Sequence, residues 1–183
     1  MPISGGLQFL NEREIFDKTG LSVGMKVACL GCGNLGFFIL PAAKIVGKEG
    51  MAYAVDIQKA ALDVVKNKAR LEGLTNLECV WSNLEKVGST NIPAGSLDVA
   101  FLVNVLFQNK NREEILAEAA RLLKKGGKLI VIDWRKIGAP FGPPPEMRVD
   151  KEQMKAYASN VNLSLIEETE FGEYFWGLLF QRI

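Results

Sequence analysis

Residues 29–38 read CLGCGNLGFF and place three glycines within six positions, between two apolar segments. Gly31, Gly33 and Gly36 form the pattern G-x-G-x-x-G. Glycine permits backbone angles that other residues avoid, and its missing Cβ lets a ligand come close to the main chain. The pattern alone is a weak indicator, because glycines also end strands for purely structural reasons, so its sequence context has to decide its meaning.

Short apolar segments recur along the chain on both sides of this stretch. They are near-continuous in apolar character, which is typical of strands buried on both faces of a parallel sheet. The expected strands cover residues 25–30, 51–57, 77–81, 97–103 and 128–133. Because helical patterns lie between them, the sequence predicts an α/β, doubly wound sheet, whose ligands bind at the carboxyl ends of the strands.

The segments between the expected strands have helical periodicity. Residues 58–72 carry an apolar face and stop at Gly73, and residues 112–124 do the same before Gly126 and Gly127. Residues 35–46 are apolar nearly all round, so we expect a buried helix there, bent at Pro41.

The pattern changes after residue 134. Residues 135–150 form a loop rich in proline and glycine, and a short helix is expected over 151–159. Two strand-like segments then flank Gly172 and Glu173, which predicts a β-hairpin that closes the sheet.

Composition limits the classes of partner. The 183 residues contain 22 Lys and Arg against 21 Asp and Glu, so no global field recruits nucleic acid or an anionic membrane. No apolar run reaches the length of a membrane span, and the first residues lack the order of a signal peptide. We therefore expect a cytoplasmic protein whose partner is neutral or mildly charged.

The three cysteines leave a redox or metal function open, since Cys29 and Cys32 form C-x-x-C within the glycine stretch. A zinc site would need more ligands nearby, but only Cys79 remains and the chain has no histidine. We therefore expect no metal site. The missing histidine also removes the side chain most often used as a general base near neutral pH.

A second landmark favours a nucleoside-containing cofactor. Asp56 closes the expected strand over 51–57, where an acid can accept hydrogen bonds from both hydroxyls of a ribose. A nicotinamide dehydrogenase normally needs an added catalytic lobe, for which this chain has little length. A dinucleotide-binding module stays open as an alternative.

The order of motifs resembles that of a known family. Residues 27–58, 101–107 and 118–134 look like successive motifs of class I S-adenosylmethionine-dependent methyltransferases, particularly the small ones similar to ubiquinone and menaquinone biosynthesis methyltransferases. The resemblance implies a three-layer, seven-stranded sheet of order 3-2-1-4-5-7-6, with strand seven antiparallel and helices on both faces. It implies one domain over 1–183, divided into an N-terminal lid (1–24), a cofactor-binding core (25–134) and an acceptor region (135–183).

The resemblance implies S-adenosylmethionine as cofactor and S-adenosylhomocysteine as product. Asp56 would hold the ribose, an oxygen of the Asn83 amide would accept from the adenine amine, and Asn104 would position the acceptor at the methyl-transfer centre. The implied cofactor-binding residues are Cys29, Gly31, Cys32, Gly33, Asn34, Asp56, Ile57, Asn83, Leu84 and Asn104.

The chain departs from the family pattern at four positions. Cys29 and Asn83 replace acids, Leu35 stands in place of the third glycine, and Phe107 stands where close relatives often have histidine. Beside the dinucleotide-binding module, two functions therefore stay open: an active methyltransferase, or a methyltransferase-fold protein that binds a nucleoside ligand or a partner without turnover.

The acceptor itself is not identified by the sequence. We expect it to be small and already nucleophilic, although a protein or RNA acceptor stays open, and no oligomeric state is indicated. The loop over 135–150 offers Phe141 and Met147 for an apolar acceptor and Arg148 for a carboxylate or phosphate, with help from the segment around 9–16.

Overall fold

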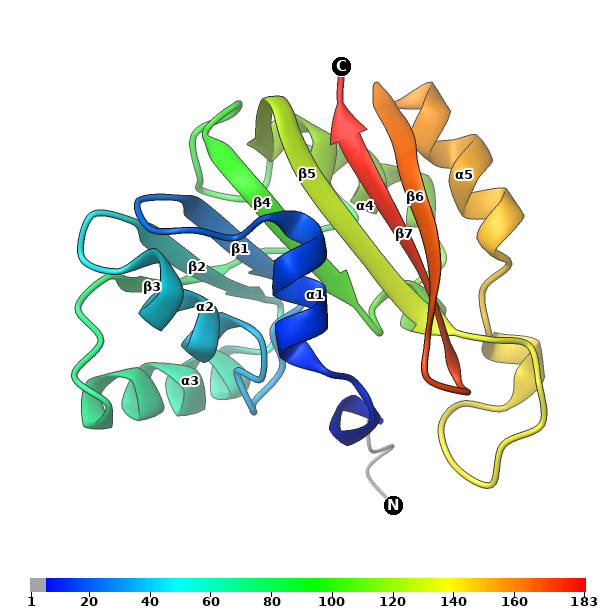
Figure 1. Cartoon of the computed structure of the whole chain (residues 1–183), viewed down its shortest axis with the longest axis horizontal. Coiled ribbons are helices and arrows are strands. Elements are labelled where there is room, and N and C mark those ends of the chain that lie inside the picture. Colours follow the sequence, from blue (N-terminus) through cyan, green and yellow to red (C-terminus); the bar gives the residue numbers. More distant parts are fainter. Residues whose placement is uncertain (1–5) are drawn as a thin grey trace.

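A computed structural model describes residues 6–183 and contains one seven-stranded sheet of order β3-β2-β1-β4-β5-β7-β6 (Figure 1). β7 is antiparallel to both of its neighbours, and the other neighbouring strands are parallel, so the predicted topology is confirmed. The strands are β1 (Lys26–Leu30), β2 (Met51–Asp56), β3 (Leu77–Trp81), β4 (Leu97–Val103), β5 (Leu123–Trp134), β6 (Leu163–Phe171) and β7 (Phe175–Arg182).

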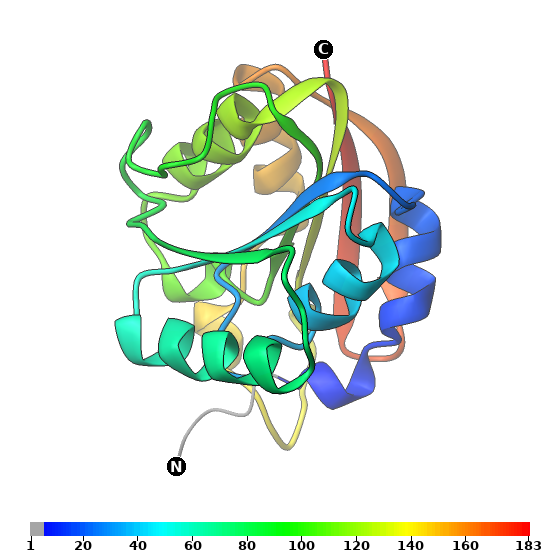
Figure 2. The same cartoon turned by 90° about the vertical axis from the view of Figure 1, so that its left-hand side faces the viewer.

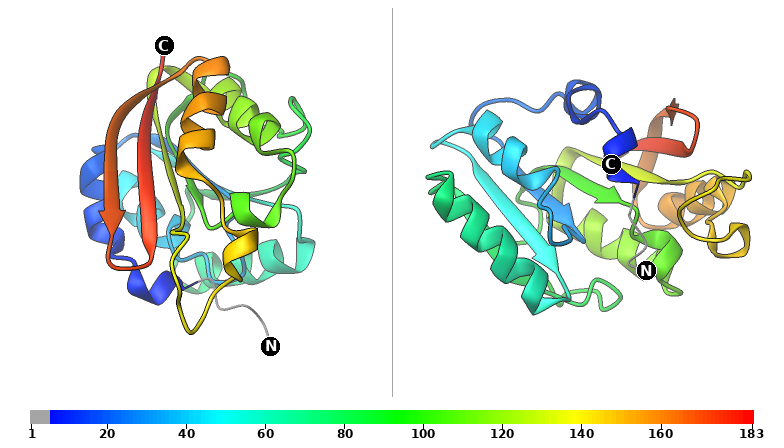
Figure 3. Two further views of the ribbon diagram at one scale, coloured as in Figure 1. Left: turned by 90° about the vertical axis from the view of Figure 1, so that its right-hand side faces the viewer. Right: turned by 90° about the horizontal axis from the view of Figure 1, so that it is seen from below.

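Helices cover both faces of the sheet and complete three layers. α1 and α2 lie on one face, while α4 and α5 lie on the other (Figures 1 and 3). α3 packs against β2 and β3. The helices are α1 (Glu12–Thr19), α2 (Ile39–Val46), α3 (Lys59–Leu71), α4 (Arg112–Leu122) and α5 (Lys151–Asn160), with short 3₁₀ helices η1 (Leu7–Phe9), η2 (Leu106–Gln108) and η3 (Pro145–Met147).

Burial follows the order of the strands. β1 and β4 are buried along nearly their whole length, as their continuous apolar sequences predict. β6, at one edge of the sheet, is mostly exposed and carries Glu167 and Glu168, which pair with Lys18 and Lys151. Charges on an edge strand discourage pairing with another chain.

Two details of the predicted helices are wrong. α2 begins at Ile39 rather than near residue 35, so Pro41 falls in its first turn, where a missing N–H breaks no helical hydrogen bond. α4 ends at Leu122 and leads directly into β5, which contains Gly126 and Gly127 at a register shift against β4. A Cβ on Gly127 would lie 2.8 Å from the Leu97 carbonyl oxygen, so this glycine serves the strand rather than the helix end.

The carboxyl ends of the parallel strands meet at one edge of the sheet. The connections that leave β1, β2, β3 and β4 gather there, towards the lower part of Figure 1, and α3 lies beside them in the foreground of Figure 2. Within residues 6–183, no helix is long and apolar enough to cross a membrane.

Glu118 of α4 holds the irregular segment 82–96 that follows β3. Its buried carboxylate accepts hydrogen bonds from the Gly88 amide (2.7 Å), the Thr90 amide (3.0 Å) and the Arg121 guanidinium (2.8 Å). Burial alone would raise the pKa of Glu118, but the hydrogen bonds from Arg121, Gly88 and Thr90 outweigh it and lower the pKa to about 2. The charged form therefore stabilises the fold above the ordinary pKa of glutamate, and this stabilisation is lost as the pH falls towards 2.

We predict that Glu118→Ala lowers the free energy of unfolding by about 3 kcal/mol at pH 7, because it strands buried donors and leaves Arg121 unpaired. Urea unfolding measures this change. Glu114→Ala, an exposed position on the same helix, is the control and should stay within about 0.5 kcal/mol of the unchanged chain. Equal stabilities of the two variants would contradict the role given to Glu118.

Candidate functional site

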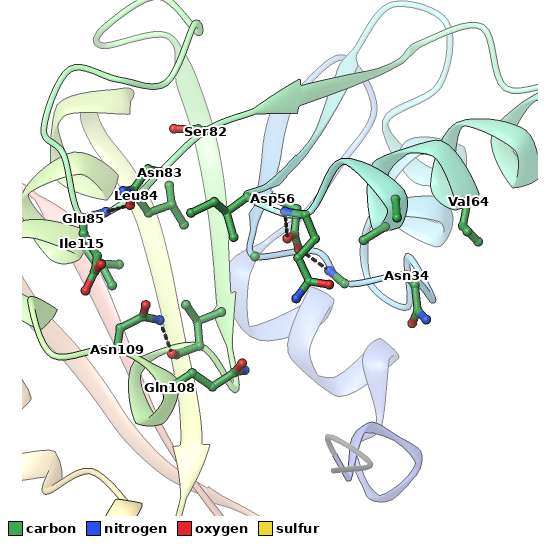
Figure 4. A pocket seen from close by; sticks show the side chains of 17 residues that line it. Asn34, Asp56, Val64, Ser82, Asn83, Leu84, Glu85, Gln108, Asn109 and Ile115 are labelled. Atoms are coloured by element: carbon green, nitrogen blue, oxygen red, sulfur yellow. Dashed lines mark hydrogen bonds between the residues drawn. The ribbon is translucent and has the colours of Figure 1, made fainter. Parts of the chain in front are cut away.

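A cavity of about 640 Å³ lies at the carboxyl ends of β1 to β4. Its volume lies in the range of small-molecule sites. Figure 4 shows Asn83, Glu85 and Ile115 on one side, Asn34 and Val64 on the other, and Asp56 between them. The lining consists of Gly31, Gly33, Asn34, Asp56, Ile57, Gln58, Ala60, Ala61, Val64, Ser82, Asn83, Leu84, Glu85, Val105, Gln108, Asn109 and Ile115.

The glycines that follow β1 have different tasks. Gly31 has a φ of +82°, and a Cβ there would lie 2.5 Å from Cγ2 of Val105. Gly33 has a φ of +60°, and a Cβ there would meet no atom within 4 Å, so this glycine leaves open space beside the cavity. Gly36 faces Leu40 and Val65 and serves helix packing. Only the first two glycines of the pattern line the cavity.

Asp56 connects the glycine turn to the end of β2. Its Oδ2 accepts from the Gly33 amide at 2.9 Å, and its Oδ1 accepts from the Gln58 amide at 2.9 Å. A carboxylate has about four lone-pair sites, so acceptor capacity remains on the side of the cavity. Asp56 thus fixes two loops and still offers negative charge to hydroxyl groups of a ligand.

The amide of Asn83 is used within the protein. Its Oδ1 accepts from the Glu85 amide at 3.0 Å and closes a turn after β3. Ser82, which precedes it, exchanges hydrogen bonds with the hydroxyls of Ser89 (3.0 Å) and Thr90 (2.9 Å). The carbonyl oxygen expected to meet an adenine amine therefore already has one donor.

Asn104 follows β4 in a left-handed conformation with a φ of +56°. Its amide donates to the Ile132 carbonyl at 2.8 Å, and its own carbonyl accepts from Nε2 of Gln108 at 2.7 Å. Its side chain is buried beside the cavity rather than in the lining. A non-glycine residue in this region is strained, and such strain is frequent at functional sites.

The sequence-based candidates divide into two groups. Gly31, Gly33, Asn34, Asp56, Ile57, Asn83 and Leu84 line the cavity, whereas Cys29, Cys32 and Asn104 do not. Sequence reasoning missed Gln58, Ser82 and Glu85, which adjoin predicted residues, and Gln108 and Asn109, which follow the strand over 97–103. Their position shortly after a predicted strand is the one feature of the sequence that could have identified them.

The two cysteines of the C-x-x-C pattern, Cys29 and Cys32, are buried and unreactive. Burial, with smaller contributions from neighbouring acidic groups, raises the pKa of the Cys29 thiol well above its usual value and that of Cys32 to about 12. Protonated thiols are poor nucleophiles and poor metal ligands. No group of residues suited to a metal ion occurs within 6–183.

Asp133, at the end of β5, is fully buried behind the segment that follows β4. Its carboxylate accepts from the Phe107 amide at 3.1 Å and from the Trp134 amide at 2.8 Å. Burial raises the pKa of Asp133 to about 7, although these hydrogen bonds and the charge of Arg112 oppose the shift. Asp133 thereby anchors η2, which contains the cavity residue Gln108 and is followed directly by the cavity residue Asn109.

Aromatic rings join the segments expected to contact an acceptor. Phe141 of the 135–150 loop stacks on Phe9 (centroids 4.8 Å apart) and meets Tyr174 edge-on (4.7 Å). Phe9 and Met147 are exposed. The N-terminal segment, the loop and the hairpin therefore meet in one aromatic cluster of Phe9, Phe141 and Tyr174.

The structure corrects the expectation for Arg148. This side chain is buried, and its guanidinium donates to the backbone carbonyls of Pro143 (2.9 Å), Arg135 (2.8 Å) and Ile137. It also lies over the ring of Trp134. Because its donors serve the loop's own backbone, Arg148 fastens the loop and does not present a fork to an acceptor.

Comparison of the sequence with known proteins gives a consistent result. Residues 21–175 match the family described as methyltransferase domain. The chain is 30% identical over 135 residues to the ubiquinone/menaquinone biosynthesis C-methyltransferase UbiE of Vibrio vulnificus strain YJ016, covering 73% of this chain and 50% of that protein. It is 31% identical over 144 residues to UbiE of Laribacter hongkongensis, covering 77% and 56%. The chain thus spans about half the length of these relatives.

Solved structures share the fold over nearly the whole chain. A SAM-dependent methyltransferase from Aquifex aeolicus superposes with a TM-score of 0.87 at 26% identity, covering 98% of this chain and 94% of that one. The [4+2]-cyclase SpnF superposes with a TM-score of 0.79 at 14% identity, covering 93% and 80%. The second likeness concerns the fold alone.

We predict that Asp133→Asn removes a pH dependence of stability. Because the folded state holds this proton up to about pH 7 and the unfolded state releases it near 4, the aspartate costs stability as the pH rises through that interval. The free energy of unfolding of the variant, relative to the unchanged chain, should therefore rise by about 4 kcal/mol between pH 4 and pH 8, since each unit of pKa difference is worth about 1.4 kcal/mol.

Urea titrations at several pH values measure this difference. Asp63→Asn, at an exposed position of α3, is the control, and its stability curve should run parallel to that of the unchanged chain. A parallel curve for Asp133→Asn as well would show that Asp133 is not a buried, proton-binding group.

Proposed function

This chain belongs to the family of class I S-adenosylmethionine-dependent methyltransferase domains, and we propose that it methylates a small, nucleophilic acceptor. The observation that carries the proposal is the position of Asp56, which fixes the open glycine turn and keeps acceptor capacity in the cavity. The dinucleotide-binding alternative loses support, because residues 21–175 match a methyltransferase domain and the sheet ends in the antiparallel strand β7.

The residues present fit an S-adenosyl cofactor. Gly33 leaves room that a Cβ would fill, Asp56 offers lone pairs to ribose hydroxyls, and Ile57 and Leu84 give apolar contact for a base. When bound, this cofactor supplies a methyl group on a positively charged sulfur, which is already an activated leaving group.

The protein's own contribution is positioning. Placing a nucleophile about 3 Å from the reacting carbon, on the correct line, supplies much of the catalysis of such a displacement. A dedicated base is optional, and the chain has no histidine to act as one. We therefore favour an acceptor that is easily deprotonated, such as a thiolate, phenolate or enolate, with Asn104 positioning the segment that faces it.

The acceptor is proposed to meet the aromatic cluster of Phe9, Phe141 and Tyr174. Exposed Met147 adds apolar surface, and Arg148 keeps the loop ordered. The relatives named for ubiquinone and menaquinone biosynthesis make an aromatic quinone precursor one candidate acceptor.

Binding without turnover is the second candidate. It is favoured by Cys29, which is buried at the position where the family pattern implies an acid, so one charge that could face the cofactor is missing. Formation of S-adenosylhomocysteine in the presence of phenolic, thiol and enolate acceptors separates the two candidates, because only a methyltransferase forms it.

We predict that Asp56→Asn raises the Kd for S-adenosylhomocysteine by about tenfold to a hundredfold, since it replaces a charged acceptor of hydrogen bonds with a neutral amide. Isothermal titration calorimetry measures the change. Asp98→Asn is the matched control, because Asp98 lies at the opposite end of the sheet, where it accepts from the Lys26 amide at 2.7 Å. The Kd of this variant for S-adenosylhomocysteine should stay within about twofold of that of the unchanged protein. Equal Kd values for the two variants would remove Asp56 from the site.

We predict that Phe141→Ala leaves the affinity for S-adenosylhomocysteine within a few fold and lowers turnover at least about tenfold, because its ring lies in the loop that follows β5. Single-turnover assays with the best acceptor measure the loss. Leu71→Ala, at an exposed position at the end of α3, is the control for general effects. Full turnover by Phe141→Ala would make the 135–150 loop a connector only.

A further inference from the structure

The indole of Trp134, at the end of β5, is fully buried, and its Nε1 has no hydrogen-bond partner within residues 6–183. The two other tryptophans of the chain pair this group with a backbone carbonyl. Trp81 donates to Ile57 at 2.8 Å, and Trp176 donates to Trp134 at 3.0 Å. A buried donor without a partner costs the free energy of removing it from water, so such a group needs an explanation in a native structure.

Two segments that are far apart in the chain close over this indole. A Cβ on Gly6 would lie 2.6 Å from Cη2 of Trp134, and a Cβ on Gly142 would lie 2.7 Å from the same atom. Both would also lie 2.9 Å from Cζ2, which neighbours the ring carbon that carries Nε1. Gly6 precedes η1, which contains Phe9, and Gly142 follows Phe141. Backbone without side chains therefore covers the edge of the indole next to its N–H.

Residues 138–142, which we call the flap, lie between two fixed points. Arg148 donates to the carbonyls of Ile137 and Pro143 (2.9 Å for the second), the residues on either side of the flap. In the part of the chain that the structure describes, the flap's own backbone makes no hydrogen bond. The flap can therefore lift from the indole while its ends stay in place and no backbone hydrogen bond breaks.

The surroundings of the indole suit a flat ring. The ring of Phe175 lies beside it, with centroids 4.5 Å apart, and the ring of Phe141 in the flap meets it edge-on at 5.9 Å. Phe141 also stacks on Phe9. Aromatic rings favour stacked or edge-on contact with a further ring. Lifting the flap therefore opens a space bordered by aromatic rings and one N–H donor.

Arg148 adds a positive charge next to the same indole. Its guanidinium carbon lies 5.5 Å from the centroid of the Trp134 ring, and the side chain is 4% exposed. Its donors serve carbonyls of the loop, and among residues 6–183 it forms no ion pair with a carboxylate. A buried charge without a counter-charge favours an anion nearby. The indole N–H and this charge together favour an anionic oxygen.

We infer that lifting of the flap uncovers Trp134, and that its indole N–H donates to an oxygen of a phenolate or enolate acceptor. The inference rests on the proposed methyltransferase function and names the group that binds its acceptor. A hydrogen bond to the charged form of an oxygen acid and a nearby positive charge both favour deprotonation of that acid. Trp134 and Arg148 thereby stabilise a nucleophile in a chain that has no histidine.

The first test records the indole N–H signals of the protein by ¹H–¹⁵N NMR. 4-Nitrophenol in its phenolate form is added to protein saturated with S-adenosylhomocysteine, and Trp134→Phe assigns one signal by removing it. The Trp134 signal should move downfield, while those of Trp81 and Trp176, whose donors already have partners, should stay in place. 4-Nitrotoluene, which has a methyl group in place of the phenolate oxygen, should cause no downfield shift.

Calorimetric titration measures the size of the effect. The unchanged protein should bind 4-nitrophenolate at least about tenfold more tightly than 4-nitrotoluene, and Trp134→Phe should lower this ratio at least about fivefold. Trp176→Phe is the matched control, because the indole N–H that it removes is already bonded within the protein, and it should leave the ratio unchanged. Unchanged affinity for S-adenosylhomocysteine shows that both variants are folded.

The outcomes separate the inference from the function on which it rests. An unmoved Trp134 signal, an equal shift with 4-nitrotoluene, or an unchanged ratio in Trp134→Phe overturns the inference and leaves the proposed function standing. Failure of 4-nitrophenolate to bind the protein loaded with S-adenosylhomocysteine also overturns only the inference. Failure of the unchanged protein to bind S-adenosylhomocysteine overturns both.

Discussion

The carboxylate of Asp56 is the interaction on which the site depends. It joins the turn after β1 to the turn after β2 through hydrogen bonds to the Gly33 and Gln58 amides. Parallel strands bring the two turns to the same edge of the sheet, but only a fixed acceptor between them holds both in one arrangement. Asp56 can do so because β2 places it at the end of a buried strand, 8% exposed, where amide donors compete well with water.

Buried ionisable side chains hold other irregular segments of the structure in the same way. Glu118 fixes the segment after β3, Asp133 fixes the segment after β4, and Arg148 fixes the loop after β5. Each meets backbone groups of an irregular segment, which has no helix or sheet to satisfy its hydrogen bonds. The loops at the carboxyl edge are therefore ordered before a ligand arrives, and pre-organisation of this kind lowers the free-energy cost of binding.

Much of the fold could be predicted from the sequence, because continuous apolar runs and helical periodicity are local signals. They placed the strands and the hairpin, and the glycines with Asp56 placed the cofactor side of the cavity. The hydrogen bonds made by Glu118 and Arg148 leave no such pattern in the sequence. The partner of Glu118 lies about 30 residues away along the chain, and the partner of Arg148 is a carbonyl of irregular backbone. Gly127 misled the prediction because a glycine that ends a helix and one at a strand irregularity look alike in sequence. Glu85 was missed for a similar reason: only the turn closed by Asn83 brings it to the cavity wall.

A crystal structure of the protein with S-adenosylhomocysteine tests the central claim most directly. The account predicts the ligand in the cavity at the carboxyl ends of β1 to β4, with its ribose hydroxyls within hydrogen-bond distance of the Asp56 carboxylate and its amino acid portion beside Gly33. A ligand bound at another place, or one in this cavity whose ribose makes no contact with Asp56, would contradict it.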